Sequence, residues 1–579
     1  MKRTSRSSTA TTAAVLGLGL LASAALAQQQ GQKVLSAPAG SGGDEKEGAT
    51  RPFDSDFEAF AKEALDRWHV PGVAVAVVDG EDIWAEGYGI SSFPSSPVTP
   101  STLFYTGSTT KAFTAAIVSL LIFSGNYSSS YGGALSFQTP LSQLIRDDFV
   151  LQEGDDWAAA HLTLEDALSH RTGFPRHDKA LLRRSGPDNH PSTVRDVARS
   201  LRYLPMAAEP RVTWRYCNLM FMVVSHAIQT LTGQWLGSAM RERIWAPLGM
   251  HSTFLSVEEA LAAPGVEVAR GYYWDYLGSG SNSREDRFVE VPYMNLDVAS
   301  GAGGIVSNVL DYARWIRCLV HECAVLPKEA HRELKTARMM LPPGSEKGYD
   351  ATLAYALGWE LGTYKGHRVF THSGGMEAYG AQVYCFPDLK YGVVTLGNTA
   401  LTSNIVGYEV AWKLINEKIG IAKEERFDWA AFGQEIIDKR LKQADTAIED
   451  LYPERADPAL PRALPLGDYV GTYFHPAYQN ITIEAIDEDV VLADERREKK
   501  RGELKAVRDN QDWQMGFEFR HASGEHWAVV IDFLNTPNML NGQLARAEFV
   551  VGVQGTADQL RVEFLEEGSE GVIVFDRVR

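Results

Sequence analysis

The hydrophobic pattern of this 579-residue chain changes at a stretch that holds four prolines, Pro453–Pro465. Before this stretch, apolar residues at helical spacing alternate with β-branched runs, and after it only short β-like runs remain. Proline continues neither a helix nor a central strand, so such a segment separates parts of a chain. The sequence therefore predicts an α+β domain, a linker, and a small antiparallel barrel or sandwich.

The strands of the first domain are expected at both ends of its sequence. Gly72–Asp79 (GVAVAVVD) is apolar and β-branched, as a buried strand requires. Later strands are expected at 367–372, 379–386 and 390–397, with a turn at Gly374-Gly375. Helical spacing predicts helices at 110–123, 192–203, 219–232 and 306–320. One sheet that joins early and late strands around a helical middle is the economical arrangement.

The second domain is predicted from short runs at regular spacing. Turn residues separate six of them: Tyr469–Phe474, Ile481–Ile486, Trp513–Phe519, Trp527–Phe533, Ala547–Val553 and Gln559–Phe564.

The N-terminus predicts export. Basic residues at Lys2, Arg3 and Arg6 precede an apolar run that ends at Ala25-Leu26-Ala27, the small-x-small pattern of a signal-peptidase site. The run is shorter than the ~20 residues that cross a bilayer, which disfavours the alternative of an uncleaved anchor. We expect a signal peptide at 1–27, a flexible Gln-, Gly- and Ser-rich leader at 28–52, a secreted protein, and no membrane span in the mature chain.

Charge and cysteine content exclude several classes of protein. The formal net charge of −18 disfavours nucleic acid binding, which needs clustered positive charge. Neither the four cysteines nor the scattered histidines have the spacing of a metal site, so no metal and no cofactor is expected. Cys318 and Cys323 are close enough in sequence to pair, but four unpaired buried thiols fit the sequence equally well.

Gly107-Ser108-Thr109-Thr110-Lys111 is the sharpest chemical motif, and it opens the predicted helix 110–123. Ser108 and Lys111 are three positions apart, so they share a helical face and the amine can reach the hydroxyl. A serine hydroxyl becomes a good nucleophile only when a neighbour accepts its proton. A lysine can do so if burial or nearby positive charge lowers its pKa.

Two further motifs follow along the chain. Tyr216-Cys217-Asn218 offers a phenol for proton relay and an amide that can hold a carbonyl, or else a packed tyrosine before a helix cap. His372-Ser373-Gly374-Gly375 offers glycines that let a substrate backbone approach a strand edge, or else an ordinary junction between a strand and a turn.

In this order, the three motifs resemble those of the serine β-lactamase/penicillin-binding-protein superfamily, which run Ser-x-x-Lys, Tyr-x-Asn and Lys/His-x-Gly. The class C β-lactamase-related branch, with its D-aminopeptidases, esterases and acyltransferases, is the most similar. The resemblance covers roughly residues 55–420 and includes four supporting stretches: Leu162–Pro175, Thr232-Gly233, Ile244–Met250 and Gly301–Ser307.

The resemblance implies a fold and domain limits. It implies a β-lactamase/transpeptidase-like domain, an antiparallel sheet flanked by helices plus an all-helical subdomain, at 53–422. A helical and proline-rich linker is expected at 423–465. The segment Gly467–Tyr473 (GDYVGTY) is similar to the lipocalin-like β-barrel that many members of this branch append, which implies a barrel domain at 466–579.

The resemblance also assigns roles to the motifs. Ser108 would be the acylated nucleophile, Lys111 its proton acceptor, and Tyr216 the general base and acid at the leaving group. Asn218 would orient the acyl amide, and the N–H groups of Ser108 and Gly375 would form the oxyanion hole.

His372 and Gly374 would line the site opposite the nucleophile. The superfamily's β-lactamases carry lysine where this chain has His372, so a fixed charge for a substrate carboxylate is missing. This departure favours esters, amides or D-amino-acid peptides over β-lactams. Substrate choice is expected from loops such as 176–191 and 272–290.

We therefore expect a secreted serine hydrolase that acts through an acyl-enzyme on a small-molecule or peptide substrate. One alternative is an acyltransferase, which uses the same acyl-enzyme with an organic acceptor. Another is a non-catalytic peptide- or cell-wall-binding protein of the same fold. A metal hydrolase and an α/β-hydrolase are disfavoured, because His-Glu-x-x-His and Gly-x-Ser-x-Gly motifs are absent from the sequence.

Overall fold

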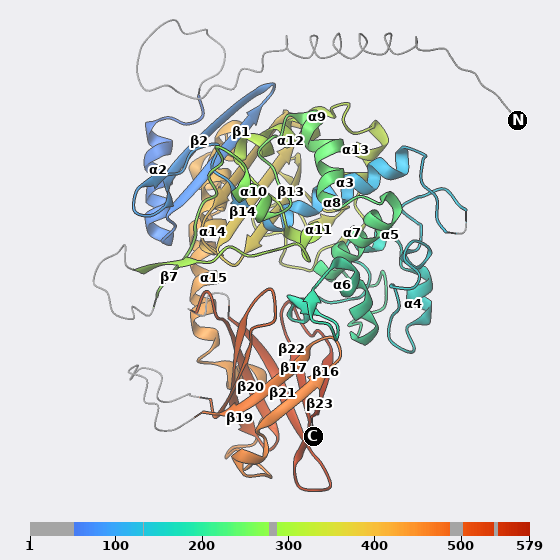
Figure 1. Ribbon diagram of the computed structural model, residues 1–579. Coiled ribbons are helices and arrows are strands. Elements are labelled where there is room, and N and C mark those ends of the chain that lie inside the picture. The colour runs from blue at the N-terminus through green and yellow to red at the C-terminus, as the bar shows by residue number, and fades with distance from the viewer. Residues whose placement is uncertain (1–50, 131, 277–286, 487–501, 538–541, 579) are drawn as a thin grey trace, which may run out of the picture. The chain divides into compact units, whose positions relative to one another are not determined.

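The computed structural model describes residues 51–130, 132–276, 287–486, 502–537 and 542–578 (Figure 1). The predicted signal peptide at 1–27 lies outside the described residues, as does the leader at 28–52 apart from Arg51 and Pro52. The described residues belong to one compact unit, so the sheet domain and the barrel are described together.

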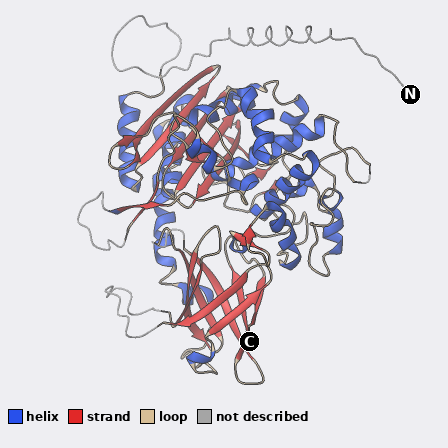
Figure 2. Cartoon of the chain, in the orientation of Figure 1, coloured by secondary structure: helices blue, strands red, loops and turns tan. Residues whose placement is uncertain are grey.

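An antiparallel sheet organises the first half of the structure (Figure 2). Strand β1 lies between β2 and β15, with Val73 opposite Gly397, which confirms the predicted pairing of early and late strands. Within the described ranges the sheet order is β10-β11-β12-β13-β14-β15-β1-β2-β3. Their bounds, in that order, are Met339–Met340, Ala354–Tyr355, Glu360–Tyr364, His367–Met376, Tyr379–Phe386, Tyr391–Gly397, Gly72–Asp79, Asp82–Ser92 and Ser96–Pro97.

Strand β1 is apolar along its length because both faces of the sheet are covered. Val73, Val75 and Val77 belong to a core that includes helices α2 (Ser55–Trp68) and α14 (Thr402–Ile419). Ala74, Ala76 and Val78 point the other way, into a core with α3 (Thr110–Phe123) and α12 (Val309–His321). Alternate side chains of a strand point to opposite faces, so an unbroken apolar run is expected where neither face meets water.

A largely helical region fills the middle of the chain, as predicted. The predicted helix 110–123 is confirmed at its predicted bounds, and 219–232 is α7 with one more residue at its start. The remaining helices here are α4 (Asp156–His161), α5 (Leu164–Leu168), α6 (Val194–Ser200), α8 (Leu236–Met240), α9 (Ala246–Leu248), α10 (Val257–Ala262), α11 (Ser300–Gly303) and α13 (Lys328–Leu334). Short two-stranded sheets pair β4 (Phe104–Tyr105) with β9 (Val306–Ser307), β5 (Arg184–Ser185) with β6 (His190–Pro191), and β7 (Gly271–Trp274) with β8 (Phe288–Val291).

The C-terminal strands close into an antiparallel eight-stranded barrel, which decides between the predicted barrel and sandwich. The strands are β16 (Gly471–His475), β17 (Gln479–Ala485), β18 (Leu504–Arg508), β19 (Met515–Ser523), β20 (His526–Phe533), β21 (Gln543–Val551), β22 (Ala557–Phe564) and β23 (Val572–Arg577). The six predicted runs match six of them, and β18 and β23 were not predicted. Both are short, and β18 follows a highly charged segment that hides its alternation.

Two helices of the predicted linker pack on the structure to either side of them. α15 (Trp429–Gln443) contacts α14, and α16 (Ala447–Leu451) contacts β20 of the barrel. Ala447 and Leu451 are buried in a small core with Ala528 and Val530. These helices therefore pack against both neighbouring parts of the chain. The predicted residue limits of the domains remain predictions.

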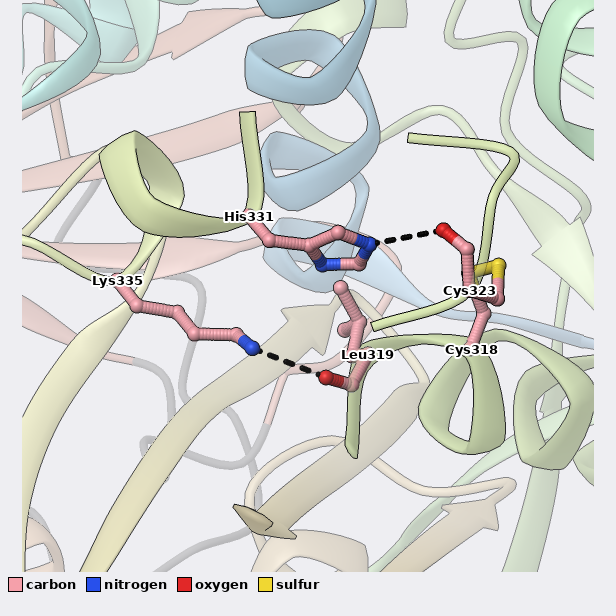
Figure 3. Close-up of a disulfide and its surroundings, with 5 residues drawn as sticks. All are labelled: Cys318, Leu319, Cys323, His331 and Lys335. Atoms are coloured by element: carbon pink, nitrogen blue, oxygen red, sulfur yellow. Dashed lines mark hydrogen bonds between the residues drawn. A yellow bond between two sulfur atoms is a disulfide. The ribbon is translucent and has the colours of Figure 1, made fainter. Parts of the chain in front are cut away.

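A disulfide joins Cys318 and Cys323 at the end of α12 (Figure 3). Lys335 Nζ donates to the carbonyl of Leu319 at 3.0 Å, and His331 Nε2 lies 3.0 Å from the carbonyl of Cys323. The pairing that the sequence left open is therefore present, while Cys217 and Cys385 are free and buried. No helix within the described ranges has the length and apolarity to cross a membrane.

One local prediction is wrong. The turn expected at Gly374-Gly375 is strand, because β13 continues through both glycines to Met376 and pairs Gly375 with Gly380 of β14. The turn comes at Glu377 and Ala378 instead. Glycines are common in turns, but here they serve the close approach of this strand to the candidate nucleophile.

Candidate active site

Ser108 lies in a single 3₁₀ turn, Gly107–Thr109, that leads directly into α3. The preceding Gly107 has φ +53°, in the region that favours glycine, and a Cβ there would lie 2.7 Å from the amide nitrogen of Gly375. The turn is thus held tightly against strand β13. This geometry fixes Ser108 between the start of a helix and the edge of the sheet.

Lys111 lies one turn further along and is fully buried. Its Nζ lies 2.9 Å from Ser108 Oγ, 2.8 Å from Asn218 Oδ1 and 2.8 Å from the carbonyl oxygen of Ala302. The last two groups accept hydrogen bonds and cannot donate in this arrangement. Acceptors therefore fill two of the three hydrogen-bonding directions of Lys111 Nζ, and the third is directed at Ser108 Oγ.

Burial, and then the positive charge of Arg176, lower the pKa of Lys111 well below its ordinary value. A neutral amine has two hydrogens and one lone pair. The hydrogens match Asn218 Oδ1 and the Ala302 carbonyl, which leaves the lone pair facing Ser108. In its neutral form, the Lys111 amine would therefore direct its lone pair at Ser108 Oγ.

Tyr216 reaches Ser108 from another direction. Its hydroxyl donates to Ser108 Oγ at 2.6 Å. Lys111 Nζ lies 4.8 Å from the centre of the Tyr216 ring, and the Arg176 guanidinium carbon lies 4.9 Å from it. Burial raises the pKa of Tyr216, against the lowering effect of Arg176, so the residue is a phenol that can donate a proton.

Asn218 is the first residue of α7 and connects Lys111 to Asp178. Its oxygen accepts from Lys111, and its Nδ2 donates to Asp178 Oδ2 at 2.9 Å. Since Asp178 can only accept, this bond determines which end of the amide faces Lys111.

The edge of β13 forms the opposite wall of the site. A Cβ on Gly374 would lie 2.0 Å from the carbonyl oxygen of Thr106, so only glycine allows the strand this close to the serine turn. Next to it, a Cβ on Gly375 would meet no atom within 4 Å, which means that its surface is open. Gly375 and Ser108 both line the same cavity.

His372 lies on β13 behind Tyr216, with 6.5 Å between the two ring centres. Its Nδ1 donates to the carbonyl of Ser373 at 2.6 Å, and its Nε2 accepts from the hydroxyl of Tyr355 at 2.9 Å. Burial, and then Lys111, lower the pKa of His372 to about 3, so the ring is neutral. His372 and Gly374 do not line the cavity, whereas Ser108, Asn218 and Gly375 do. His372 therefore packs behind the cavity wall, and both of its ring nitrogens are occupied by hydrogen bonds within the protein.

The cavity beside Ser108 has a volume of about 260 Å³ and is lined by both parts of the chain. Loop 176–191, which was expected to influence substrate choice, contributes Arg176, Asp178 and Lys179. The barrel contributes Trp513, Met515, Phe533, Gln543 and Glu566, which lie where β19 and β21 begin and β20 and β22 end. In an antiparallel barrel these positions form one rim, so a rim of the barrel lines the site. The sequence predicted none of these barrel residues, since nothing links them to the three motifs.

Ion pairs connect that rim to loop 176–191. Arg176 Nε lies 3.0 Å from Asp178 Oδ2 and 3.3 Å from Glu566 Oε1, and its Nη1 lies 2.8 Å from Glu567 Oε1. Lys179 Nζ lies 3.1 Å from Glu566 Oε2. Burial disfavours the ionised form of Glu566 and so raises its pKa. The charges of Arg176 and Lys179 have a larger opposite effect and lower the pKa of Glu566 to about 2. The carboxylate is thus ionised and paired.

Among the described residues, no group of three or more His, Cys, Asp or Glu side chains is placed to hold a metal ion.

The sequence is similar to known hydrolases. A family model described as Beta-lactamase matches residues 57–411. The unguisins hydrolase ungD' of Aspergillus campestris is 40% identical over 514 residues, covering 88% of this chain and 89% of that protein. A D-aminopeptidase of Brucella anthropi is 25% identical over 399 residues, covering 67% of this chain and 68% of that protein.

The fold is similar to a solved structure, the octameric penicillin-binding protein homologue from Pyrococcus abyssi. The TM-score is 0.53 at 19% identity, with 90% of this chain and 99% of that chain covered. At this identity the likeness concerns the fold.

Proposed function

Because the chain belongs to the Beta-lactamase family, we propose that it is a serine hydrolase that works through an acyl-enzyme on Ser108. The observation that carries the proposal is the set of contacts around Lys111. Two acceptors take the hydrogens of a neutral amine and the remaining contact is Ser108 Oγ. A structural lysine in a buried site would need a carboxylate partner, and here the contacts at Nζ are all neutral groups.

In the first step, the Ser108 proton passes to Lys111 while Oγ bonds to the substrate's carbonyl carbon. The amide nitrogens of Ser108 and Gly375 stabilise the oxyanion that forms. Tyr216 then gives its proton to the leaving nitrogen or oxygen, and the bond to the leaving group breaks. Lys111 returns the proton to Tyr216 directly or through water, since all three groups meet at Ser108.

In the second step, water attacks the ester that Ser108 has formed with the acyl group. The proton of this water passes to Tyr216 or Lys111, the bond to Oγ breaks, and Ser108 regains a proton. Asn218 is placed to hold the acyl amide at the cavity surface while Asp178 keeps its orientation.

We propose amide bonds as the main substrate class, with esters as reactive substitutes. The names of the two relatives, an unguisins hydrolase and a D-aminopeptidase, support unguisins and peptides with D-residues as first candidates. The neutral and enclosed His372 supports the same choice over β-lactams, since it offers no cation to a substrate carboxylate.

Two alternatives share this site. An acyltransferase would differ only in accepting an alcohol or amine in place of water. A binding protein without turnover would have no use for a buried lysine directed at a serine, so the Lys111 contacts argue against it. We also propose that the protein is secreted; the Cys318–Cys323 disulfide supports this, because such bonds persist in oxidising compartments.

The experiment is intact-protein mass spectrometry after brief exposure to p-nitrophenyl esters, D-alanine p-nitroanilide, unguisins and a β-lactam. Wild type is compared with Ser108→Ala and with Ser101→Ala, an exposed serine seven positions earlier. We expect an acyl adduct on wild type and on Ser101→Ala, and none on Ser108→Ala. An adduct that persists on Ser108→Ala, or a wild type that forms neither adduct nor product, would reject the proposed nucleophile.

A further inference from the structure

Glu377 is a buried carboxylate that the proposed mechanism does not use. It lies in the turn between β13 and β14, and only 4% of its surface is exposed. Its Oε2 accepts a hydrogen bond from Asn535 Nδ2 at 3.1 Å, while its Oε1 has no partner among the described residues. Glu377 also lines the cavity that contains Ser108.

The surroundings of Glu377 do not neutralise it. The neighbouring cavity wall is apolar at Met376, Trp513, Met515 and Phe533. Burial raises the pKa of Glu377 to about 7, against the hydrogen bond of Asn535 and the charge of Arg183. Of the cations that line the cavity, Arg176 and Lys179 are paired with Glu566, and Arg440 donates to the carbonyl oxygen of Gly542. A buried carboxylate with one unpaired oxygen is costly, and a cationic or N–H-bearing ligand would remove that cost.

The place of Glu377 in the cavity indicates which part of a substrate it meets. Gly375 lies against the serine turn, and Glu377 follows in the turn where β13 ends. Both residues line the cavity that contains Ser108, whereas Tyr216 does not. The leaving group must lie toward Tyr216, which protonates it. The acyl part therefore occupies the cavity that Glu377 lines.

We propose that the carboxylate of Glu377 binds a protonated amine on the acyl part of the substrate. This inference rests on the proposed acyl-enzyme, because that mechanism determines which side of Ser108 the acyl part occupies. The apolar wall beside Glu377 surrounds the carbon skeleton that bears the amine. Substrates with a free amine near the reacting carbonyl are thus favoured over their acylated counterparts.

The test compares two inhibitors of p-nitrophenyl butyrate hydrolysis at pH 7.5, D-alaninamide and N-acetyl-D-alaninamide. They differ at the amine, which is charged in the first and is a neutral acetamide in the second. For wild type we expect a Ki at least tenfold lower for D-alaninamide, since a hydrogen bond to a charged group is worth about a factor of ten or more. Glu377→Gln keeps the shape and removes the charge, so the two Ki values should become equal within threefold. Glu424→Gln, at an exposed glutamate, should behave as wild type.

Butyrate ester hydrolysis serves as the internal reference, because butyrate has no amine. Glu377→Gln must hydrolyse this ester measurably for its two Ki values to be determined, and thermal melting shows whether the variant is folded. Equal Ki values for the two inhibitors in wild type, or a preference that survives in Glu377→Gln, would overturn the inference. If the ester is not hydrolysed by wild type at all, the proposed function fails instead, and the two failures are thus distinguished.

Discussion

Replacing Lys111 with methionine tests the central claim of the mechanism. Methionine is unbranched and close to lysine in size, so it can fill the same buried space without the amine. The change removes the group 2.9 Å from Ser108 Oγ and leaves the Tyr216 hydroxyl in place at 2.6 Å. It therefore separates proton acceptance by Lys111 from proton donation by Tyr216.

The expected loss follows from the contacts. A positioned general base contributes about 10²- to 10⁴-fold, or roughly 3–5 kcal/mol at the transition state. Stability should change less. The variant leaves Asn218 Oδ1 and the Ala302 carbonyl without their donor, at about 1–3 kcal/mol each, but it also removes a buried amine that costs free energy to desolvate.

The assay measures kcat for p-nitrophenyl butyrate and the rate of acyl adduct formation by mass spectrometry. Lys423→Met, at an exposed lysine, is the control and should match wild type. Thermal melting shows whether Lys111→Met is folded. A folded variant that retains more than a tenth of the wild-type acylation rate would refute Lys111 as the base and assign proton acceptance to Tyr216.

Three further outcomes are expected. Arg176→Met should lower the free energy of unfolding by about 1 kcal/mol, read from urea denaturation, because it breaks the ion pairs with half-buried Glu566 and exposed Glu567; an unchanged midpoint would mean that these ion pairs contribute nothing. Neutral His475, whose pKa burial lowers to about 4, should contribute stability that is complete above about pH 6.5 and is lost as pH falls toward 4, by up to about 1.4 kcal/mol per unit. The contribution is the change with pH in the free-energy difference between wild type and His475→Gln, since Glu377, with its pKa raised to about 7, acts with the opposite sign in both proteins alike; a difference that stays constant over this range would contradict it. Reducing the Cys318 bridge, or changing both its cysteines to serine, should cost about 2 kcal/mol for so short a loop, measured by denaturation with and without reductant; equal stabilities would argue against this estimate.

The sequence predicted the elements whose signals are local. The apolar run of β1 is recognisable because both faces of the sheet are covered, and the helix that follows Ser108 has its predicted bounds. Ser108, Lys111, Tyr216 and Asn218 meet as the motifs suggested, although Ser108 and Tyr216 are 108 positions apart. The order of the three motifs along the chain predicted that their side chains meet, whereas their separation in sequence did not.

Other parts of the site depend on contacts between residues far apart in sequence, and no local sequence pattern indicates these contacts. Lys179 and Glu566 meet across 387 positions, and no pattern near either one indicates the other. His372 was expected to face a substrate, but Tyr355 from a neighbouring part of the sheet holds its free nitrogen. A histidine's rotamer and partners are decided by packing, which single-residue patterns do not encode.

The wall that the barrel contributes has a consequence for how this enzyme could diversify. Ser108, Lys111 and Tyr216 belong to one part of the chain, while Trp513, Met515 and Phe533 belong to another. Exchanges at the ends of barrel strands can reshape the pocket while every reacting atom stays where it is. Related enzymes could thus inherit one chemistry and acquire new substrates by recombination or drift in their last hundred residues, a separation that directed evolution could exploit by randomising that rim alone.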